Sequence, residues 1–488
     1  MDVVNNERHK DTVLRHDAYT DNEDSTSLLH HAQLPCYGPE LPHPSEYLLL
    51  DDNIDNSQLN KLLNRHISRL LTSYSVDINH GFLPPVDPLP QLSLSSKFAC
   101  WELIMMDLSQ YLHAKNIRSV ILSRLNVVHV EQNDLLDERE FQRALFVLAV
   151  LSHAFVWGEK PTSTYIPSCL AIPWVELTKR ACRPPVLTHS LMTLGNWKRF
   201  DIEKPIELGN IATLNCFLSG IDEANFYLVM TELECRGAKA LKHMLRAQYF
   251  GSKRKVKELT SELKAIHSIQ ETMFATLLKI YDEVDPYIFY NRVRHFLAGW
   301  KGNPSLPDGM LYEGVSETRQ FLHGASAAQS SLIAAFDVFF DVKHVSERTR
   351  EFISEMRFYM PLKHRQFLEM LGADNHNING IVKKLTSNEE GQQEKELLYA
   401  YNACIDQLIA FRNKHIQIAA LYILAQTQKN ADGIQLDSKK ETNHTVNGND
   451  INGKEQVETA SSARGTGGTI LMPFLKACRD ETMVQRLN

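Results

Sequence analysis

Apolar residues recur at spacings of three and four along most of this chain, which is the pattern of helices that bury one face. Before residue 200 the pattern predicts helices over 57–74, 97–114 and 137–157. After residue 210 it predicts helices over 211–218, 223–250, 255–284, 286–298, 330–340, 346–357 and 394–424, and a short one after 469. The alternation typical of strands is scarce. The sequence therefore predicts an all-α fold, with a small N-terminal helical domain and a larger C-terminal helical domain.

Polar and proline-rich stretches set the expected boundaries. Residues 1–45 are rich in Asp and His and are expected to form a flexible tail. Residues 46–199 are expected to form the small domain, which ends in a proline-punctuated connection over the surface at 161–196. Residues 200–488 then form the large domain. Within it, 426–464 has almost no large apolar residue, which predicts a disordered loop that acts as a lid.

Charge and cysteine usage narrow the classes of partner and location. The chain has 488 residues and a formal net charge of −7. Nucleic acids and anionic membranes attract clustered positive charge, so this acidity argues against both as partners. The longest apolar run, 144–157, is shorter than the roughly 20 residues of a spanning helix and predicts a buried helix. The N-terminus lacks the order of a secretory signal and the eight cysteines include no Cys-x-x-Cys, so we expect a cytoplasmic protein without a zinc site or a disulfide framework.

One predicted helix places a histidine among apolar residues. Its apolar face is formed by Cys404, Leu408, Phe411, His415, Ile418 and Tyr422. His415 could be a core histidine that bonds a nearby carbonyl. The pattern alone favours that core role. It is also compatible with a haem ligand, because a neutral imidazole in an apolar wall is what the iron requires, and no second ligand stands at zinc spacing. Arg412, one turn earlier, could reach a carboxylate or a haem propionate.

Three further segments carry candidate chemistry. Residues 324–331 have almost no bulky side chain, so they either let a flat ligand lie against the backbone or form a plain loop with a serine helix cap. Asp337 follows in an apolar helical turn and needs a polar partner. Residues 285–294 place aromatic residues before an arginine, which suits an aromatic carboxylate or a packed helix with a surface arginine. The glycine run 465–469 has no Walker pattern, but its backbone N–H groups could bind a carboxylate.

Five blocks together resemble the indoleamine 2,3-dioxygenase family, in a fungal-type form with a divergent pocket. They are 299–304 (GWKGNP), 326–331 (SAAQSS), 356–365 (MRFYMPLKHR), 412–418 (RNKHIQI) and 464–469 (RGTGGT). The resemblance implies a two-domain all-α protein that binds haem b in its larger domain and uses O2 as co-substrate. The implied reaction inserts dioxygen across the indole C2–C3 bond of L-tryptophan to give N-formylkynurenine, in the kynurenine pathway toward NAD synthesis.

The resemblance also implies roles for individual residues. It makes His415 the proximal ligand of the haem iron, supported by a pair formed by Asp337 and Arg412. It makes Arg294 the partner of the substrate carboxylate, with Thr466 closing over the same end. The residues implied for the indole pocket and the distal haem face are Phe226, Phe289, Tyr290, His189, Ser326 and Ala327. No catalytic protein base is implied, because the cofactor supplies the chemistry while the protein positions the substrate. We expect a monomer.

Four pocket positions depart from the common family pattern. Met230 stands where a serine is usual, His189 where a tyrosine is usual and Met192 where a cysteine is usual; Tyr290 replaces the second residue of a Phe-Phe pair. These departures leave three hypotheses open. The chain is an active tryptophan dioxygenase, or a haem-binding member with another indole substrate or a sensor role and little tryptophan turnover, or a helical interaction protein without a cofactor.

Overall fold

The chain folds into a mostly helical molecule. The computed structural model describes residues 55–373, 377–387, 391–429 and 463–488. Within this part, the strands form only two short two-stranded ladders. The predicted all-α class is therefore confirmed.

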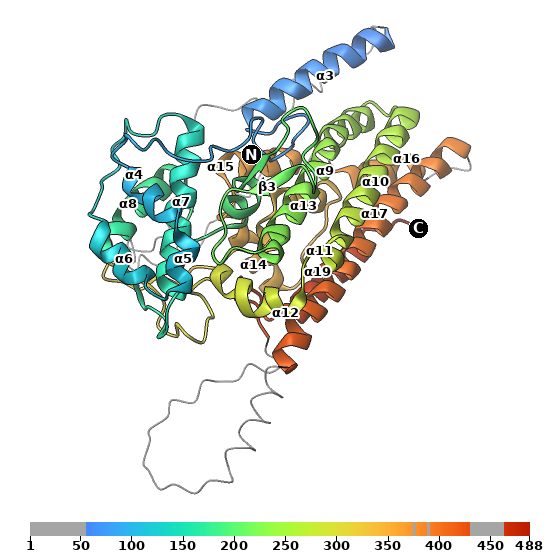
Figure 1. The fold of residues 1–488 in the computed structure, drawn as a ribbon. Coiled ribbons are helices and arrows are strands. Elements are labelled where there is room, and N and C mark those ends of the chain that lie inside the picture. Colours follow the sequence, from blue (N-terminus) through green and yellow to red (C-terminus); the bar gives the residue numbers. More distant parts are fainter. Residues whose placement is uncertain (1–54, 374–376, 388–390, 430–462) are drawn as a thin grey trace, which may run out of the picture.

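Five helices gather on one side of the molecule, in the blue to cyan shades of Figure 1. They are α4 (Ala99–Met105), α5 (Leu108–His113), α6 (Ile117–Arg124), α7 (Glu138–Trp157) and α8 (Ser168–Arg180). α7 is the buried helix that the apolar run predicts, since its residues from Ala144 to Val156 are all buried. It begins where the Asp137 side chain accepts the backbone N–H groups of Arg139 and Glu140, which satisfies two donors of the first turn.

The long helices lie on the other side of the molecule (Figure 1). α10 (Val256–Leu278) packs against both α9 (Ile221–Ser252) and α17 (Gln392–Ala419). α16 (Ile378–Thr386) and α19 (Leu471–Met483) pack on α17. Most of the predicted helical periodicity after residue 210 belongs to these elements, so the pattern is confirmed there.

Four large helices remain outside these two groups. They are α3 (Asn56–Ser73), α13 (Ser331–Phe339), α14 (Glu347–Arg357) and α15 (Leu362–Leu371). α3 lies against α9, where Arg246 donates hydrogen bonds to Asn60 and Asn64 at 2.9 and 3.1 Å. One continuous hydrophobic core includes residues from both groups. The domain boundary expected near residue 200 stays a prediction.

Residues 161–196 do not form the predicted surface connection. They contain α8, which packs on α7, and residues 186–188 and 190–194 are buried. The prediction was wrong because it treated each proline as the end of a helix. Pro167 stands before the first turn, where the chain is extended, and Pro173 is accommodated inside α8 on its buried side.

One segment predicted as a helix begins with a strand. Residues 211–218, predicted as a helix, begin with β3 (Ile211–Thr213), which pairs antiparallel with β2 (Trp197–Arg199). Pairing with a distant segment outweighs local preference in so short a stretch. The second ladder is parallel, between β1 (Tyr165–Ile166) and β4 (Leu311–Tyr312).

The loop expected at 426–464 is shorter than the composition predicts. Helix continues through residue 429, and Gln426 and Thr427 are each 3 % exposed. At the other end Ala463 is buried and Arg464 forms a bridge with Ile470. The disorder prediction was wrong at both ends, because neighbouring elements bury these polar residues. Residues 430–462 and the predicted tail 1–45 lie outside the described residues.

Two sequence expectations about the whole chain can be compared with the described residues. None of the helices in these ranges is both long and apolar enough to cross a lipid bilayer. Six cysteines are free thiols, but Cys182 is disulfide-bonded. The sequence analysis expected no disulfide framework, and its cysteine spacing gave no signal for the bond at Cys182.

A buried histidine of α7 hydrogen-bonds two segments that lie far from it in the sequence. His153 of α7 is fully buried, and its Nδ1 lies 2.7 Å from the carbonyl oxygen of Phe296. Its Nε2 accepts the backbone N–H of Leu187 at 3.0 Å, so Nδ1 carries the proton and donates. Burial lowers the pKa of His153 to about 4, so the ring is neutral at pH 7. This ring therefore holds the segments that carry two candidate site residues, His189 and Arg294.

Acid should weaken the fold through His153. Its pKa in the folded chain is about 4, against 6.5 for a histidine in the unfolded chain, so the unfolded chain binds more protons between these values and stability falls as pH drops through that window. We expect this residue to remove about 2 kcal/mol of unfolding free energy between pH 7.5 and pH 5. Urea titrations at both pH values should show the advantage of wild type over His153→Gln shrinking by that amount. The exposed His113→Gln variant is the control, and an equal change in both variants would contradict the assignment.

Candidate active site

Two adjoining cavities lie between the long helices and the loops that follow them. The larger has a volume of about 480 Å³ and the smaller about 190 Å³. The larger lies in the size range of small-molecule and cofactor sites. The walls of both include His189, Phe226, Met230, Ala327, Ala328, His415 and Ile418. The sequence thus brings most of its candidate residues to one place.

His415 of α17 lines both cavities. Burial, helped by the neighbouring charge of Arg412, lowers the pKa of His415 to about 4, so the ring is neutral at pH 7. What little surface the ring exposes faces the cavities. No described residue hydrogen-bonds either ring nitrogen. The hypothesis of a core histidine bonded to a carbonyl is therefore wrong, and a neutral imidazole with available nitrogens is what a metal ligand requires.

Asp337 of α13 and Arg412 of α17 form an ion pair beside His415. Burial alone would lower the pKa of Arg412, but the carboxylate of Asp337 outweighs it and the pKa is raised. The partner expected for Asp337 is thus present. Because Asp337 already balances the charge of Arg412, the other guanidinium of the larger cavity, Arg357 of α14, is better placed to meet an anionic ligand.

Arg294 enters the wall of the smaller cavity. It begins a 3₁₀ turn, Arg294–Leu297, and its guanidinium lies 5.4 Å from the centre of the Tyr290 ring. One terminal nitrogen donates to the carbonyl oxygen of Arg464. Its Nε is buried and has no hydrogen-bond partner among the described residues. A buried charged donor without an acceptor indicates a missing anionic ligand.

The glycine-rich loop closes the same end of the smaller cavity, and Thr466 and Gly467 line it. The Thr466 hydroxyl donates to the carbonyl oxygen of Ala325, so it positions the loop. Two close backbone contacts seat these segments. A Cβ on Gly299 would lie 2.2 Å from the backbone nitrogen of Gly324, and a Cβ on Gly468 would lie 2.4 Å from a carbonyl oxygen. Glycine is required at these two contacts, which explains one glycine in each of the GWKGNP and RGTGGT blocks.

Three π-helical turns surround the smaller cavity. Within the described residues, the π-helical turns are Ser190–Leu194, Phe289–Val293 and Ala420–Leu424. Each contributes to the wall, through Met192 and Thr193, through Phe289, and through Tyr422 and Ile423. An extra residue in a helical turn redirects the side chains after it. The predicted helix at 286–298 is therefore helical but irregular, and this irregularity sets where Arg294 points.

Sequence comparison agrees with this geometry. The sequence model of the indoleamine 2,3-dioxygenase family matches residues 70–485. The chain belongs to the indoleamine 2,3-dioxygenase family. The recognition made from the five sequence blocks is thus confirmed.

Individual relatives match over nearly their whole length. Indoleamine 2,3-dioxygenase of Saccharomyces cerevisiae is 35% identical over 435 residues, which covers 85% of this chain and 93% of the relative. Indoleamine 2,3-dioxygenase 2 of Homo sapiens is 33% identical over 421 residues, covering 85% and 94%. The 6-hydroxytryptophan 2,3-dioxygenase of Fusarium equiseti is 30% identical over 415 residues, covering 84% and 96%. These relatives are named as dioxygenases, which are oxidoreductases.

The positions that depart from the common indoleamine 2,3-dioxygenase pattern do not all lie in the pocket. Met230 and His189 line both cavities, and Met192 lines the smaller one. Tyr290 lines neither cavity. Its ring supports the guanidinium of Arg294 and its hydroxyl lies 3.0 Å from that of Thr427. Contrary to the expectation, Tyr290 therefore lies outside the walls of both cavities, because adjacent residues of a helical turn point in different directions and Phe289 is the one that enters the cavity.

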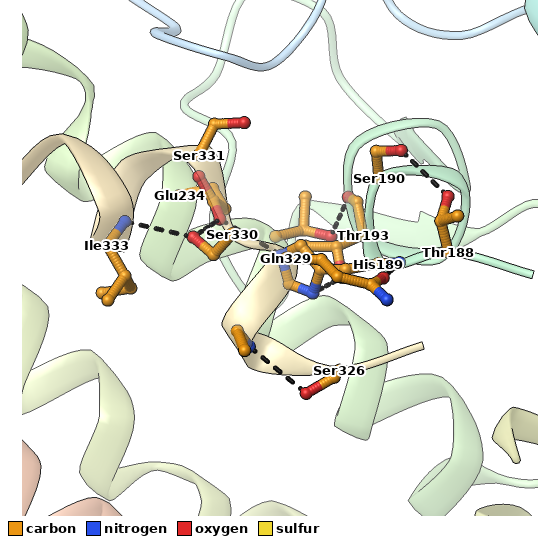
Figure 2. A network of polar contacts seen from close by, with 12 residues as sticks. Thr188, His189, Ser190, Thr193, Glu234, Ser326, Gln329, Ser330, Ser331 and Ile333 are labelled. Atoms are coloured by element: carbon orange, nitrogen blue, oxygen red, sulfur yellow. Dashed lines mark hydrogen bonds and ion pairs between the residues drawn. The ribbon is translucent and has the colours of Figure 1, made fainter. Parts of the chain in front are cut away.

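A polar network, not anticipated from the sequence, surrounds His189 (Figure 2). The Glu234 carboxylate accepts a hydrogen bond from the Ser330 hydroxyl at 2.6 Å and lies 3.2 Å from Nε2 of His189. The backbone N–H of His189 donates to the side-chain oxygen of Gln329 at 2.9 Å. Because a carboxylate only accepts, Nε2 of His189 donates and the ring orientation is determined. Ser326 and Ala327, expected at the distal face, lie at the start of this segment and line the smaller cavity.

The sequence contained a signal for part of this network. Phe226, Met230 and Glu234 recur at a spacing of four along α9, so they share one face of the helix. A carboxylate on a face with two apolar pocket residues indicates a buried polar contact. The partner residues Ser330 and Gln329 could not be identified this way, because their contact with α9 is set by tertiary packing.

Proposed function

We propose that this chain is a haem-dependent dioxygenase that converts L-tryptophan to N-formylkynurenine, with haem b in the larger cavity and His415 as the ligand of the iron. The proposal depends on one observation: a neutral imidazole without a hydrogen-bond partner among the described residues lines both cavities. The family to which the chain belongs supports the same activity.

The residues of the larger cavity fit haem. Its wall is mainly apolar, as a porphyrin ring requires, with side chains such as Ile333, Leu408 and Phe411. The Arg357 guanidinium and the Lys343 ammonium also line it and would meet the two carboxylates of haem. Haem, when bound, supplies the iron chemistry that activates dioxygen. The ion pair of Asp337 with Arg412 would keep the helix of His415 in position.

The smaller cavity fits an aromatic amino acid. The rings of Phe226 and Phe289 pack with centroids 4.4 Å apart and line it, so they would contact the indole. The unpaired Nε of Arg294 would donate to the substrate carboxylate. Thr466 and its glycine neighbours would then exclude water from that end. These residues bind and orient the substrate, and no protein base is assigned.

The sensor hypothesis is not favoured, because the relatives are named as dioxygenases. The family alone does not determine which indole is preferred, since one relative is named for 6-hydroxytryptophan. The residues that would contact a ring substituent include His189 and Met230, which line both cavities. We propose L-tryptophan as the main substrate, in a cytoplasmic monomer that serves the kynurenine pathway and NAD synthesis.

Absorption spectroscopy tests the function directly. Protein purified after expression with haem supply is expected to show a Soret band, and tryptophan should shift the spectrum of the reduced, carbon-monoxide-bound form. Addition of reductant, tryptophan and air should yield N-formylkynurenine. A haem-loaded protein that makes none of this product would contradict the tryptophan assignment, and a protein without a Soret band would contradict the whole proposal.

A further inference from the structure

Three side chains to which the proposed function assigns no role meet at the edge of the larger cavity, and two of them belong to its wall. They are His344, in the loop before α14, and Cys478 and Glu481 of α19. One ligand atom from each lies within 4.8 Å of the other two. The side chains of His344 and Glu481 are 10% and 11% exposed, and Cys478 is 5% exposed. The group therefore combines nitrogen, sulfur and oxygen donors in a sheltered place that solvent still reaches.

The carboxylate of Glu481 is already oriented for a ligand role. Its Oε1 accepts the backbone N–H of Val345 at 2.9 Å, which leaves Oε2 turned toward Nδ1 of His344 at 2.7 Å. Metal-binding carboxylates are commonly held in this way by a hydrogen bond to their second oxygen. The one-turn spacing of Cys478 and Glu481 on α19 places both on the same face of that helix.

A second site in the chain shows what the cysteine adds. His129 and Glu176 form the same arrangement, with Nδ1 2.7 Å from one carboxylate oxygen and the N–H of Val130 donating to the other at 2.7 Å. Both sites contain a His-Val pair clasped by a glutamate, but among the described residues only the first has a third donor within ligand distance. A His–Glu clasp alone is a structural contact. Cys478 turns it into a set of three metal-ligand types.

We propose that His344, Cys478 and Glu481 bind a zinc-type divalent cation, at a site separate from the haem iron. Imidazole, thiolate and carboxylate are the protein ligands of zinc, at about 2.0–2.3 Å from the ion. Ligand atoms around a tetrahedral ion are therefore roughly 3.3–3.8 Å apart, which the three side chains reach by shifts of about 1 Å. Three protein ligands leave the fourth position to water or a small anion.

Binding exchanges a proton for the metal. The Cys478 thiol loses its proton to solvent as sulfur binds the cation. The proton that Nδ1 of His344 donates to Glu481 moves through solvent to Nε2 of the same ring, so that Nδ1 and the carboxylate oxygen can both coordinate. No electron is transferred. Arg412, which pairs with Asp337, lies next to the sulfur of Cys478 and can only donate to it, so the site adjoins the ion pair next to His415. A bound zinc ion would therefore lie on the same side of the larger cavity as His415, the proposed haem ligand.

Metal stoichiometry of the haem-loaded protein tests the proposal. After equilibrium dialysis against Zn²⁺ at micromolar concentration and removal of loose metal, wild type is expected to retain about one zinc per chain besides its haem iron. Cys478→Ser and His344→Ala should each weaken zinc binding by at least about 100-fold, because loss of a ligand should exceed the 10–100-fold cost of a lost supporting contact. A haem spectrum and a thermal unfolding curve for each variant would verify that it is folded.

Two matched variants separate this site from adventitious binding. His129→Ala removes the corresponding histidine of the clasp without a cysteine, and Cys100→Ser removes a free thiol elsewhere. Both should retain the zinc of wild type. Zinc lost equally from all four variants, zinc retained by Cys478→Ser, or no zinc on wild type would each overturn the proposal. Glu481→Gln, which keeps the shape of the side chain, should also lose zinc; its retention would remove Glu481 from the ligand set.

Discussion

Replacing His415 by alanine is expected to abolish haem-dependent activity while leaving the helices folded. His415 is the only residue assigned to the iron, and no described residue hydrogen-bonds its ring, so the fold loses little polar contact with it. Haem affinity and turnover should fall by at least about 100-fold, because a direct ligand matters more than the supporting contacts whose loss costs 10–100-fold. Haem content by absorption, N-formylkynurenine formation and the circular dichroism of the helices measure the three quantities.

His267→Ala is the matched control for this variant. It removes a histidine from α10, the helix packed against α17, where His267 has only a 3.7 Å contact with Glu271. Its haem content and activity should equal those of wild type. A His415→Ala protein that still bound haem with unchanged affinity and spectrum would disprove the proposed coordination, and a loss of helical structure would mean that the ring serves the fold.

Replacing Arg294 by alanine is expected to lower kcat/KM for L-tryptophan by about 10- to 150-fold, since a charge-assisted hydrogen bond is worth about 1.5–3 kcal/mol and each 1.36 kcal/mol corresponds to tenfold. The reason is the buried Nε, which has no acceptor among the described residues until a carboxylate arrives. Haem content should be unchanged, because Arg294 lines only the smaller cavity. Steady-state kinetics and the Soret absorbance measure the two effects.

A neighbouring arginine and a truncated substrate sharpen this test. Arg292, two residues earlier and exposed to solvent, should tolerate alanine without kinetic effect. Tryptamine has no carboxylate, so any turnover of it should be no lower in Arg294→Ala than in wild type. An equal loss for both substrates, or a parallel loss of haem, would show that Arg294 holds the loop through the Arg464 carbonyl and does not bind the carboxylate.

Local pattern was sufficient where a segment's environment follows from its own residues. The continuous apolar stretch of α7 predicted a buried helix, and Asp137 marked its start. The long periodic stretches of α9, α10 and α17 were equally clear. Failures occurred where a distant partner outweighed local preference. β3 pairs with β2, Pro173 lies inside a helix packed on α7, and Gln426 and Thr427 are buried by neighbouring elements.

Candidate site residues divide in the same way. The alternating spacing on α17 placed His415 in an apolar stripe, but the same pattern fits both a core histidine and a haem ligand. The two hypotheses differ in whether the ring nitrogens are hydrogen-bonded, and no described residue bonds them. Tyr290 illustrates the opposite case. The sequence suggested that it shares the pocket with Phe289, but adjacent residues of a helical turn point in different directions, and the Tyr290 ring lies against the guanidinium of Arg294.

The amino-acid sequence alone determined the helical class and the family, and it predicted the histidine, arginine and aspartate that we propose at the centre of the site, because periodicity and motif order are properties of the chain itself. Tertiary structure decided which of these side chains share a cavity, which buried nitrogen lacks an acceptor, and that His344 meets a cysteine and a glutamate far along the chain. The physical reason is that cavities and ligand sets arise from the packing of distant segments, and a hydrogen bond left unmade is visible only when every neighbour is in place.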